Sequence, residues 1–330
     1  MTASLHERSL VIDGLQICNW SREIFEEQHA AGLSAVNCTC SIWEGFAATM
    51  ENVARFRARI KENADILCPI SDVADIEVAK SEKRVGVILG FQNTWAIEDR
   101  IDRLELFHSL GVRVIQMTYN TQNLVGAGCW ESRDGGLSDY GRDVLAEMNR
   151  LGILADLSHV GAQTATDVVE ASQSPVVYSH VCPHALNPHP RNKTDEQIRA
   201  VVERGGLVGV TLLPWFLSAD GVASRDDYLQ AIEHMIDVAG EESIGIGTDF
   251  MQGYGIEFLT WLRRDKGVGR LLAPMPDPDA ALVTAPTGLE RVATLPALTA
   301  AMESRGWSNQ RIERVLGLNW LRLFGDVWKN

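Results

Sequence analysis

The stretch from residue 152 to residue 159 reads GILADLSH, a nearly continuous apolar run that ends in a polar pair. A short run of this kind, without alternation of apolar and polar residues, is typical of a strand covered on both faces of a parallel sheet. Outward from it, seven further runs share the pattern. They are residues 9–14, 34–42, 85–91, 112–119, 175–180, 206–213 and 243–249. Eight such runs, alternating with helical segments, predict one TIM-type (β/α)₈ barrel of the α/β class.

The segments between these runs carry apolar positions at helical spacing. We expect helices over residues 51–63, 98–110, 139–151, 164–172, 194–204 and 226–239, and two more over 295–306 and 309–327. Several of them end at a glycine, such as Gly152, which suits a left-handed C-terminal cap. Residues 256–287 show few periodic signals and contain the run PMPDP at 274–278, which favours a loop or lid. The chain is therefore predicted to be one domain, 1–330, with a lid-like insertion at about 256–290.

Composition favours a small molecule as the partner. The net charge of −14 disfavours binding to nucleic acid or to an anionic membrane surface. No apolar stretch approaches the ~20 residues that span a bilayer, and residues 1–8 do not resemble a signal peptide. The six cysteines show no regular framework, so we expect reduced thiols and a cytoplasmic protein.

Catalytic residues of such a barrel gather at the C-terminal ends of its strands, so the polar residues that end each run are candidates. These are Asp13, Cys38, Cys40, Glu44, Gln92, Tyr119, Asn120, His159, His180 and Asp249. His159 and His180 end successive strands 21 residues apart, which predicts imidazoles close enough to share a metal ion or a substrate. Asp249 ends the eighth strand and is expected to face the same space, although it would also suit a helix cap.

For the other histidines and for the cysteines, the sequence favours a structural role. His184 and His189 lie on a proline-rich loop, where we expect exposed side chains. Cys38 and Cys40 alternate across one strand, so their sulfur atoms face opposite sides and cannot chelate one ion. A thiolate role for Cys182, two residues after His180, stays open.

Several segments resemble the membrane (renal) dipeptidase family, zinc enzymes that hydrolyse dipeptides on a barrel of this kind. The matching segments include VIDG at 11–14, LGVR at 110–113, GGLS at 135–138, MNRLG at 148–152, DLSHV at 156–160, GIGTDF at 245–250 and GLNWLRLF at 317–324. The resemblance implies that His159 and His180 bind the second of two zinc ions. It implies further that Arg191 grips a substrate carboxylate and that Asp249 exchanges a proton with the metal-bridging water. It also implies a homodimer.

Comparison with the same family also shows positions at which this sequence differs from the family pattern. The family's His-x-Asp pair on the first strand is replaced by Leu15 and Ile17, and its bridging glutamate by Gln92. The substrate-binding histidine becomes Tyr119, and an acidic residue after Asp249 becomes Met251. A two-zinc centre cannot be assembled from such residues, so we expect one zinc ion or none.

These observations give one assignment of roles. Asp249 and Tyr119 are the expected catalytic residues, and Arg191, Tyr119 and Asn120 are expected to bind substrate. A metal, where present, would be held by His159, His180, Asp249 and Gln92. The expected activity is that of a dipeptidase-like amidohydrolase cleaving a small substrate, or dipeptide, with a free carboxylate. Two alternatives stay open. One is a non-peptidase enzyme on the same barrel, which could be another amidohydrolase, a lyase or an isomerase, and the other is a catalytically inactive binding protein.

Overall fold

A computed structural model describes residues 3–273 and 283–328 of the chain. The proline-rich run at 274–278 lies outside the described residues. No helix among the residues described is long and apolar enough to cross a membrane.

The predicted barrel is confirmed, and each of the eight apolar runs overlaps one of its strands. In barrel order these are β1 (Ile12–Gln16), β2 (Ala35–Ser41), β4 (Val85–Phe91), β5 (Val112–Gln116), β6 (Leu154–Asp156), β7 (Val177–Val181), β8 (Leu207–Val210) and β9 (Ile244–Ile246). Neighbouring strands pair in parallel. The ring closes just beyond β9, where the amide of Ile17 donates to the carbonyl of Phe250 at 2.9 Å. All strand ends of one polarity therefore meet at one rim.

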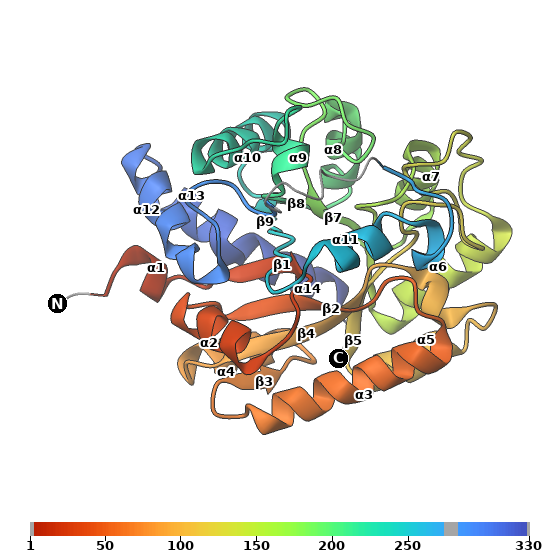
Figure 1. The fold of residues 1–330 in the computed structure, drawn as a ribbon, viewed down its shortest axis with the longest axis horizontal. Coiled ribbons are helices and arrows are strands. Elements are labelled where there is room, and N and C mark those ends of the chain that lie inside the picture. The colour runs from red at the N-terminus through yellow and green to blue at the C-terminus, as the bar shows by residue number, and fades with distance from the viewer. Residues whose placement is uncertain (1–2, 274–282, 329–330) are drawn as a thin grey trace.

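The helices surround the sheet, with α3 along one side and α8, α9 and α10 along the opposite side (Figure 1). Their bounds are α1 (Leu5–Arg8), α2 (Arg22–Ala30), α3 (Phe46–Glu62), α4 (Val73–Ser81), α5 (Arg103–Ser109), α6 (Asp139–Leu151), α7 (Ala162–Ala171), α8 (Asp195–Val202), α9 (Pro214–Leu217), α10 (Arg225–Ala239), α11 (Ile256–Leu262), α12 (Pro296–Ser304), α13 (Asn309–Glu313) and α14 (Asn319–Val327). The predicted cap is present at Gly152, which takes the left-handed conformation with φ of 74°.

Two parts of the sequence prediction need correction. Residues 256–287 were expected to form a loop or lid, and the described part of this segment is not all loop, because it contains α11 and the short 3₁₀ helix η2 (Asp265–Gly267). The helix buries Leu259 and Leu262 over the strand ends, a tertiary contact that stabilises a segment too short to show clear periodicity. The prediction also omitted β3 (Leu67–Pro69), a three-residue strand that pairs with the barrel only through β4.

The N-terminal end of the barrel is closed by Trp320 of α14. Its indole nitrogen donates to the carbonyl of Ile246 at 2.9 Å, and its ring is 1% exposed. Gly14 and Gly245 make room for the ring, because an added Cβ would lie 2.0 Å and 2.4 Å from its atoms. With this end filled by an aromatic side chain, a ligand has access only from the opposite rim.

Candidate active site

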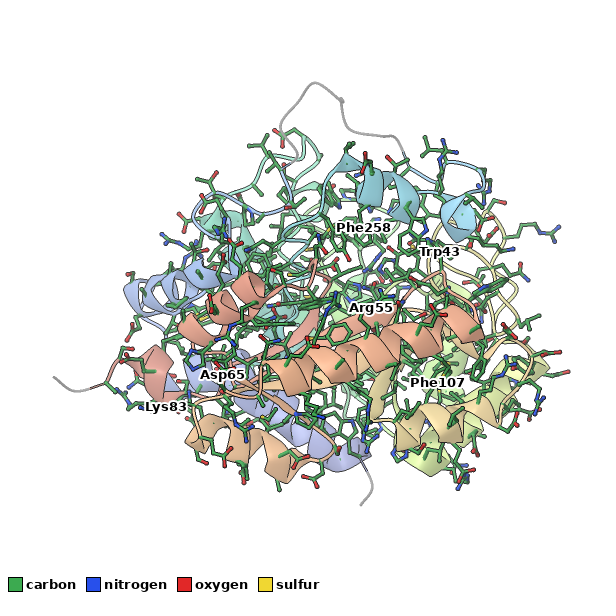
Figure 2. The ribbon with its side chains drawn as sticks, turned by 60° about the horizontal axis from the view of Figure 1, so that its bottom comes forward. Trp43, Arg55, Asp65, Lys83, Phe107 and Phe258 are labelled. Atoms are coloured by element: carbon green, nitrogen blue, oxygen red, sulfur yellow. The ribbon has the colours of Figure 1, made fainter. Side chains whose placement is uncertain are left out.

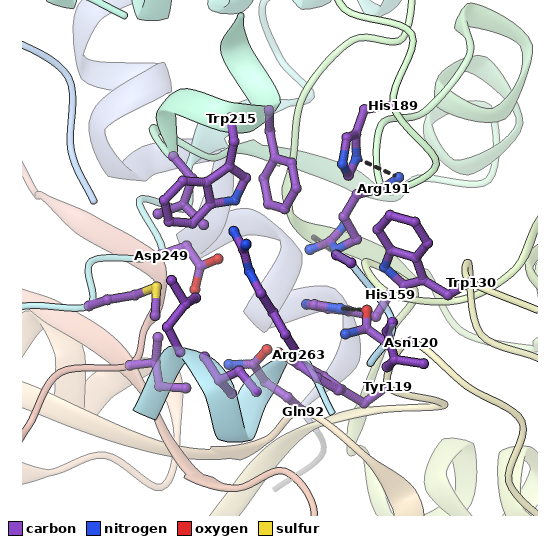
Figure 3. A pocket seen from close by; sticks show the side chains of 18 residues that line it. Gln92, Tyr119, Asn120, Trp130, His159, His189, Arg191, Trp215, Asp249 and Arg263 are labelled. Carbon is purple, nitrogen blue, oxygen red and sulfur yellow. Dashed lines mark hydrogen bonds between the residues drawn. The ribbon is translucent and has the colours of Figure 1, made fainter. Parts of the chain in front are cut away.

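A pocket lies at the C-terminal rim of the strands, where the barrel fold places catalytic residues (Figure 3). It holds about 650 Å³ of space not filled by atoms, part of which is open to solvent. Most of its lining is apolar or aromatic, and the polar members are Gln92, Asn120, His159, His189, Arg191, Asp249 and Arg263. Tyr119 also lines it.

The two predicted histidines meet at the base of this pocket. The Nε2 atoms of His159 and His180 lie 3.0 Å apart, although β6 and β7 contribute them separately. The other ring nitrogen of His159 contacts Oδ1 of Asn120 at 2.7 Å. His159 lines the pocket, whereas His180 lies fully buried behind it. Burial, with the cations Arg191 and Lys193 nearby, holds the pKa of both imidazoles well below the usual range, so both rings are neutral at pH 7.

A buried polar chain supports the histidines from below. Nδ1 of His180 lies 2.6 Å from the hydroxyl of Ser179, which donates to Oδ2 of Asp156 at 2.5 Å. The other oxygen of Asp156 accepts from the hydroxyl of Ser158 at 2.6 Å. Burial raises the pKa of Asp156, and these hydrogen bonds oppose the rise. The chain fixes the orientation of both rings, as the outer partners of a ligand histidine commonly do.

Arg191 is 1% exposed and spans the ends of β6 and β7. Its Nη1 donates to the carbonyl of Ser158, and its Nη2 donates to the carbonyl of His180 at 2.9 Å. A guanidinium carries five N–H groups, so these two bonds leave donors that face the pocket. Arg191 therefore braces two strands and still presents positive charge to a bound ligand.

Asp249 follows β9 and faces the same pocket. Its backbone has φ of 59°, a left-handed conformation that few residues other than glycine adopt without a cost. Burial, together with the nearby carboxyls of Asp13 and Asp156, raises its pKa to about 8, although Arg191 opposes the rise. The carboxyl is mostly protonated at pH 7 and close to the point where it exchanges a proton.

Tyr119 and Asn120 lie in the loop that follows the fourth barrel strand, β5, which ends at Gln116, and both line the pocket. The Tyr119 ring stacks on His159 with centroids 4.1 Å apart, and burial raises the pKa of its phenol. The phenol therefore keeps its proton at neutral pH and is able to donate a hydrogen bond to a ligand. Asn120 has φ of 59°, like Asp249, and directs its amide oxygen to His159. Two of the pocket's polar side chains thus stand on left-handed backbone.

The rim at β1 and β4 has a different character. Ile17 lines the pocket, and Leu15 is 2% exposed in the hydrophobic core. Gln92 lines the same pocket, and its Nε2 donates to Oγ1 of Thr39 at 2.9 Å. The described residues that line the pocket on this side include no carboxylate and no imidazole.

This donor set does not fit the zinc centre that the resemblance implies. Two bonds of ~2.0–2.1 Å from one ion would span the distance between the two Nε2 atoms. Zinc in enzymes usually takes a third protein ligand, however, and within residues 3–273 and 283–328 no group of three His, Cys, Asp or Glu side chains is placed to hold an ion. The apolar atoms of Leu15 and Ile17 offer no lone pairs for a second ion.

Three side chains that line the pocket were not predicted from the sequence to lie there. Arg263 follows α11 and reaches across the pocket toward Asp249 and Trp215 (Figure 3), with its guanidinium carbon 5.4 Å from the centre of that indole. His189, expected to be exposed, lines the pocket and packs on Phe216 with centroids 4.9 Å apart. Trp130 packs on the other side of His189 at 5.5 Å. All come from loops, where no periodic signal reveals which side chains fold over a site.

Comparison with known proteins decides the family. A family model described as membrane dipeptidase (peptidase family M19) matches residues 20–261 and 276–330. The chain belongs to the membrane dipeptidase family. Its relatives in that family are hydrolases of the metallopeptidase kind.

Three similar proteins illustrate the range of this family. An amidohydrolase from Pseudomonas aeruginosa is 47% identical, with a TM-score of 0.95 over 98% of each chain. Dipeptidase aclJ of Aspergillus oryzae is 30% identical over 285 residues, which are 84% of this chain and 61% of that protein. A metallo peptidase from Rhodobacter sphaeroides, solved with a phosphinate mimic of the dipeptide L-Ala-D-Ala, has a TM-score of 0.81 over 97% of this chain and 100% of that one. At 22% identity it shows a shared fold.

Proposed function

We propose that this dipeptidase-family protein is an amidohydrolase that cleaves a small substrate with a free carboxylate and holds at most one divalent metal ion. The observation that carries the proposal is the pocket itself. It combines two arginines with a proton-exchanging carboxyl, Asp249, inside a wall that is mainly apolar and aromatic.

The arginines favour an anionic group on the substrate. Arg191 and Arg263 both line the pocket of a protein whose net charge is −14. Planar guanidinium groups bind a carboxylate with two parallel hydrogen bonds, and burial strengthens that attraction. The apolar lining from Leu213, Leu259 and Leu262 suits an uncharged remainder. A dipeptide or an N-acyl amino acid with a free C-terminus has this combination of groups.

Asp249 and Tyr119 supply the chemistry in this proposal. The ionised carboxylate of Asp249 takes a proton from the water that attacks the scissile carbonyl carbon. The resulting carboxyl then gives a proton to the leaving nitrogen as the C–N bond breaks. The phenol of Tyr119 donates a hydrogen bond to the carbonyl oxygen as negative charge develops there. A pKa of about 8 suits both halves of this exchange near neutral pH.

A matched substrate panel tests the proposal. The purified chain would be assayed against dipeptides and N-acyl amino acids, each paired with its C-terminal amide, with and without added zinc. We expect release of the C-terminal amino acid from the free acids and at least ~10-fold lower kcat/KM for the amides, because the arginines lose their anion. Equal rates for acids and amides would contradict the assigned carboxylate.

A second candidate is an enzyme on the same barrel that does not hydrolyse peptides. The replacement of three ligand positions by Leu15, Ile17 and Gln92 favours it. Elimination or isomerisation of a carboxylic acid needs proton transfer of the kind that Asp249 provides. Binding of carboxylates in the pocket, with no turnover of any amide on the panel, would replace the amidohydrolase proposal with this one.

A further inference from the structure

A second cavity lies beside the active-site pocket, on the other side of Ile17. It holds about 710 Å³ of space not filled by atoms, part of which is open to solvent. Its walls come from the ends of β1 and β2, from α3 and from the segment that contains α11. Only Ile17 lines both spaces. The proposed reaction makes no use of this cavity.

Two arginines on α3 give the cavity a positive side. Arg55 and Arg59 are four residues apart, so both lie on the same face of the helix, and both line the cavity. Figure 2 shows Arg55 on the side of α3 that faces Phe258. Among the residues that the structure describes, no carboxylate lies within 4.0 Å of either guanidinium, whereas Arg22 and Arg103 each have such a partner.

Glu44 provides a negative group in the same cavity. Its Oε2 accepts from the amide of Ile42 at 2.8 Å, which fixes the carboxylate in place. Its Oε1 has one long contact, 3.4 Å from Nδ2 of Asn52, and so keeps acceptor capacity for a cation. Burial raises the pKa of the Tyr254 phenol, a rise that Arg59 opposes and Glu44 reinforces. Both charges therefore act on one side chain of the cavity wall.

Aromatic rings complete the wall opposite α3. Tyr254 and Phe258 stack with centroids 3.5 Å apart, and Trp261 continues the stack 5.5 Å from Phe258. All three rings are half-buried and line the cavity. A flat, preformed aromatic surface binds an apolar side chain with little loss of conformational entropy.

We propose that this second cavity binds the zwitterion of a small α-amino acid. The carboxylate lies between Arg55 and Arg59, the ammonium group on Glu44, and the side chain against Tyr254 and Phe258. Opposite charges facing one small ligand account for two arginines without carboxylate partners and for a glutamate oxygen with acceptor capacity. The proposal does not depend on the reaction at the neighbouring pocket, since it concerns binding alone.

Calorimetric titration of the full-length chain tests this proposal with three probes. L-Phenylalanine carries both charges, N-acetyl-L-phenylalanine lacks the ammonium group, and phenethylamine lacks the carboxylate. We expect saturable binding of one L-phenylalanine and at least ~10-fold weaker binding of either analogue, a difference of about 1.4 kcal/mol or more. No binding of L-phenylalanine at millimolar concentration, or equal binding of the N-acetyl analogue, would overturn the proposal.

Four variants locate the binding. Arg59→Ala and Glu44→Gln should each weaken binding at least ~10-fold, and Gln keeps an oxygen to accept from the Ile42 amide. Lys61→Ala, on the same helix and outside the cavity lining, is the matched control and should leave binding unchanged. Asp249→Asn should also leave it unchanged. Loss of binding in Asp249→Asn with full binding in Arg59→Ala would place the amino acid in the active-site pocket and contradict the assignment.

Discussion

The two halves of the active-site rim differ in kind. At β6 and β7, His159 and His180 stand on a buried chain of hydrogen bonds that runs through Ser179 to Asp156. At β1 and β4, the corresponding space is lined by Ile17 and by Gln92, whose side chain has one hydrogen bond, to Thr39.

The contrast is between a half of the rim that depends on a buried polar chain and a half that does not. A buried polar chain is stable only while each member has its partner, so its retention requires several residues to be kept together. The half with Ile17 has no comparable chain of buried polar side chains among the described residues that line the pocket. The half at β6 and β7 orients neutral imidazoles and holds Arg191 in place. These side chains can bind a substrate whether or not a metal ion is present.

The largest effect is expected at Asp249, which lies between the two halves. Asp249→Asn keeps the shape of the side chain but cannot exchange a proton, so kcat should fall at least ~100-fold with little change in KM. In the wild type, kcat/KM should rise with pH and level off above about pH 8, because the attacking water needs the ionised carboxylate. A variant that keeps more than about a third of the wild-type kcat would exclude Asp249 from the chemistry.

Removing one hydrogen bond should lower the free energy of unfolding by different amounts in the two halves of the rim. Ser179→Ala removes the hydroxyl that joins Asp156 to His180, and the groups left unpaired are fully buried, so unfolding should become easier by about 1–3 kcal/mol. Thr39→Val removes one hydrogen bond from the uncharged amide of Gln92, which lines the pocket although it is only 3% exposed. Its expected cost is below about 1 kcal/mol. Urea unfolding of both variants measures the difference, and equal costs would remove the contrast.

The variant Arg263→Ala tests whether a loop residue contributes to substrate binding beside His159, His180 and Arg191. Arg263→Ala should raise KM about 10-fold for the substrate with a free carboxylate and leave kcat nearly unchanged, since it removes binding and no proton transfer. Arg264→Ala is the control, because that exposed side chain donates to the carbonyl of Gly269 and does not line the pocket. Steady-state kinetics compare the two variants. An unchanged KM in Arg263→Ala would leave Arg191 as the carboxylate ligand.

A smaller effect is expected in the pH dependence of stability. The pKa of Asp249 is about 8 in the folded protein and near 3.8 for an ordinary aspartate, so the folded state retains a proton that the unfolded chain releases between these values. The stabilisation is complete below about pH 4 and is lost as the pH rises through 8. Asp249→Asn removes this dependence and should gain roughly 1 kcal/mol or more over the wild type between pH 5 and pH 9. Parallel melting curves of the two proteins across this range would contradict the raised pKa.

The sequence was sufficient for the strands and for much of the site. Buried parallel strands leave continuous apolar runs, and polar residues at their ends meet at one rim, which is why the contact between His159 and His180 was predictable. What was missed belongs to segments whose positions depend on tertiary contacts. The strand β3 has three residues, and α11 is stabilised by burying Leu259 and Leu262. Arg263 and His189 lie on loops, where a sequence gives no sign of which side chains turn inward.

The number of zinc ions bound per chain tests the difference between the two halves most directly. The purified protein would be dialysed with excess zinc, freed of loosely bound metal and measured by elemental analysis, alongside the variant Leu15→His/Ile17→Asp/Gln92→Glu. The wild type should retain at most one ion, because Ile17 and Gln92, the described residues that line the pocket at β1 and β4, offer no imidazole or carboxylate, and the triple variant should retain one more than the wild type. Two tightly bound ions in the wild type would contradict the account, since they would show that the rim with Ile17 and Gln92 still holds metal.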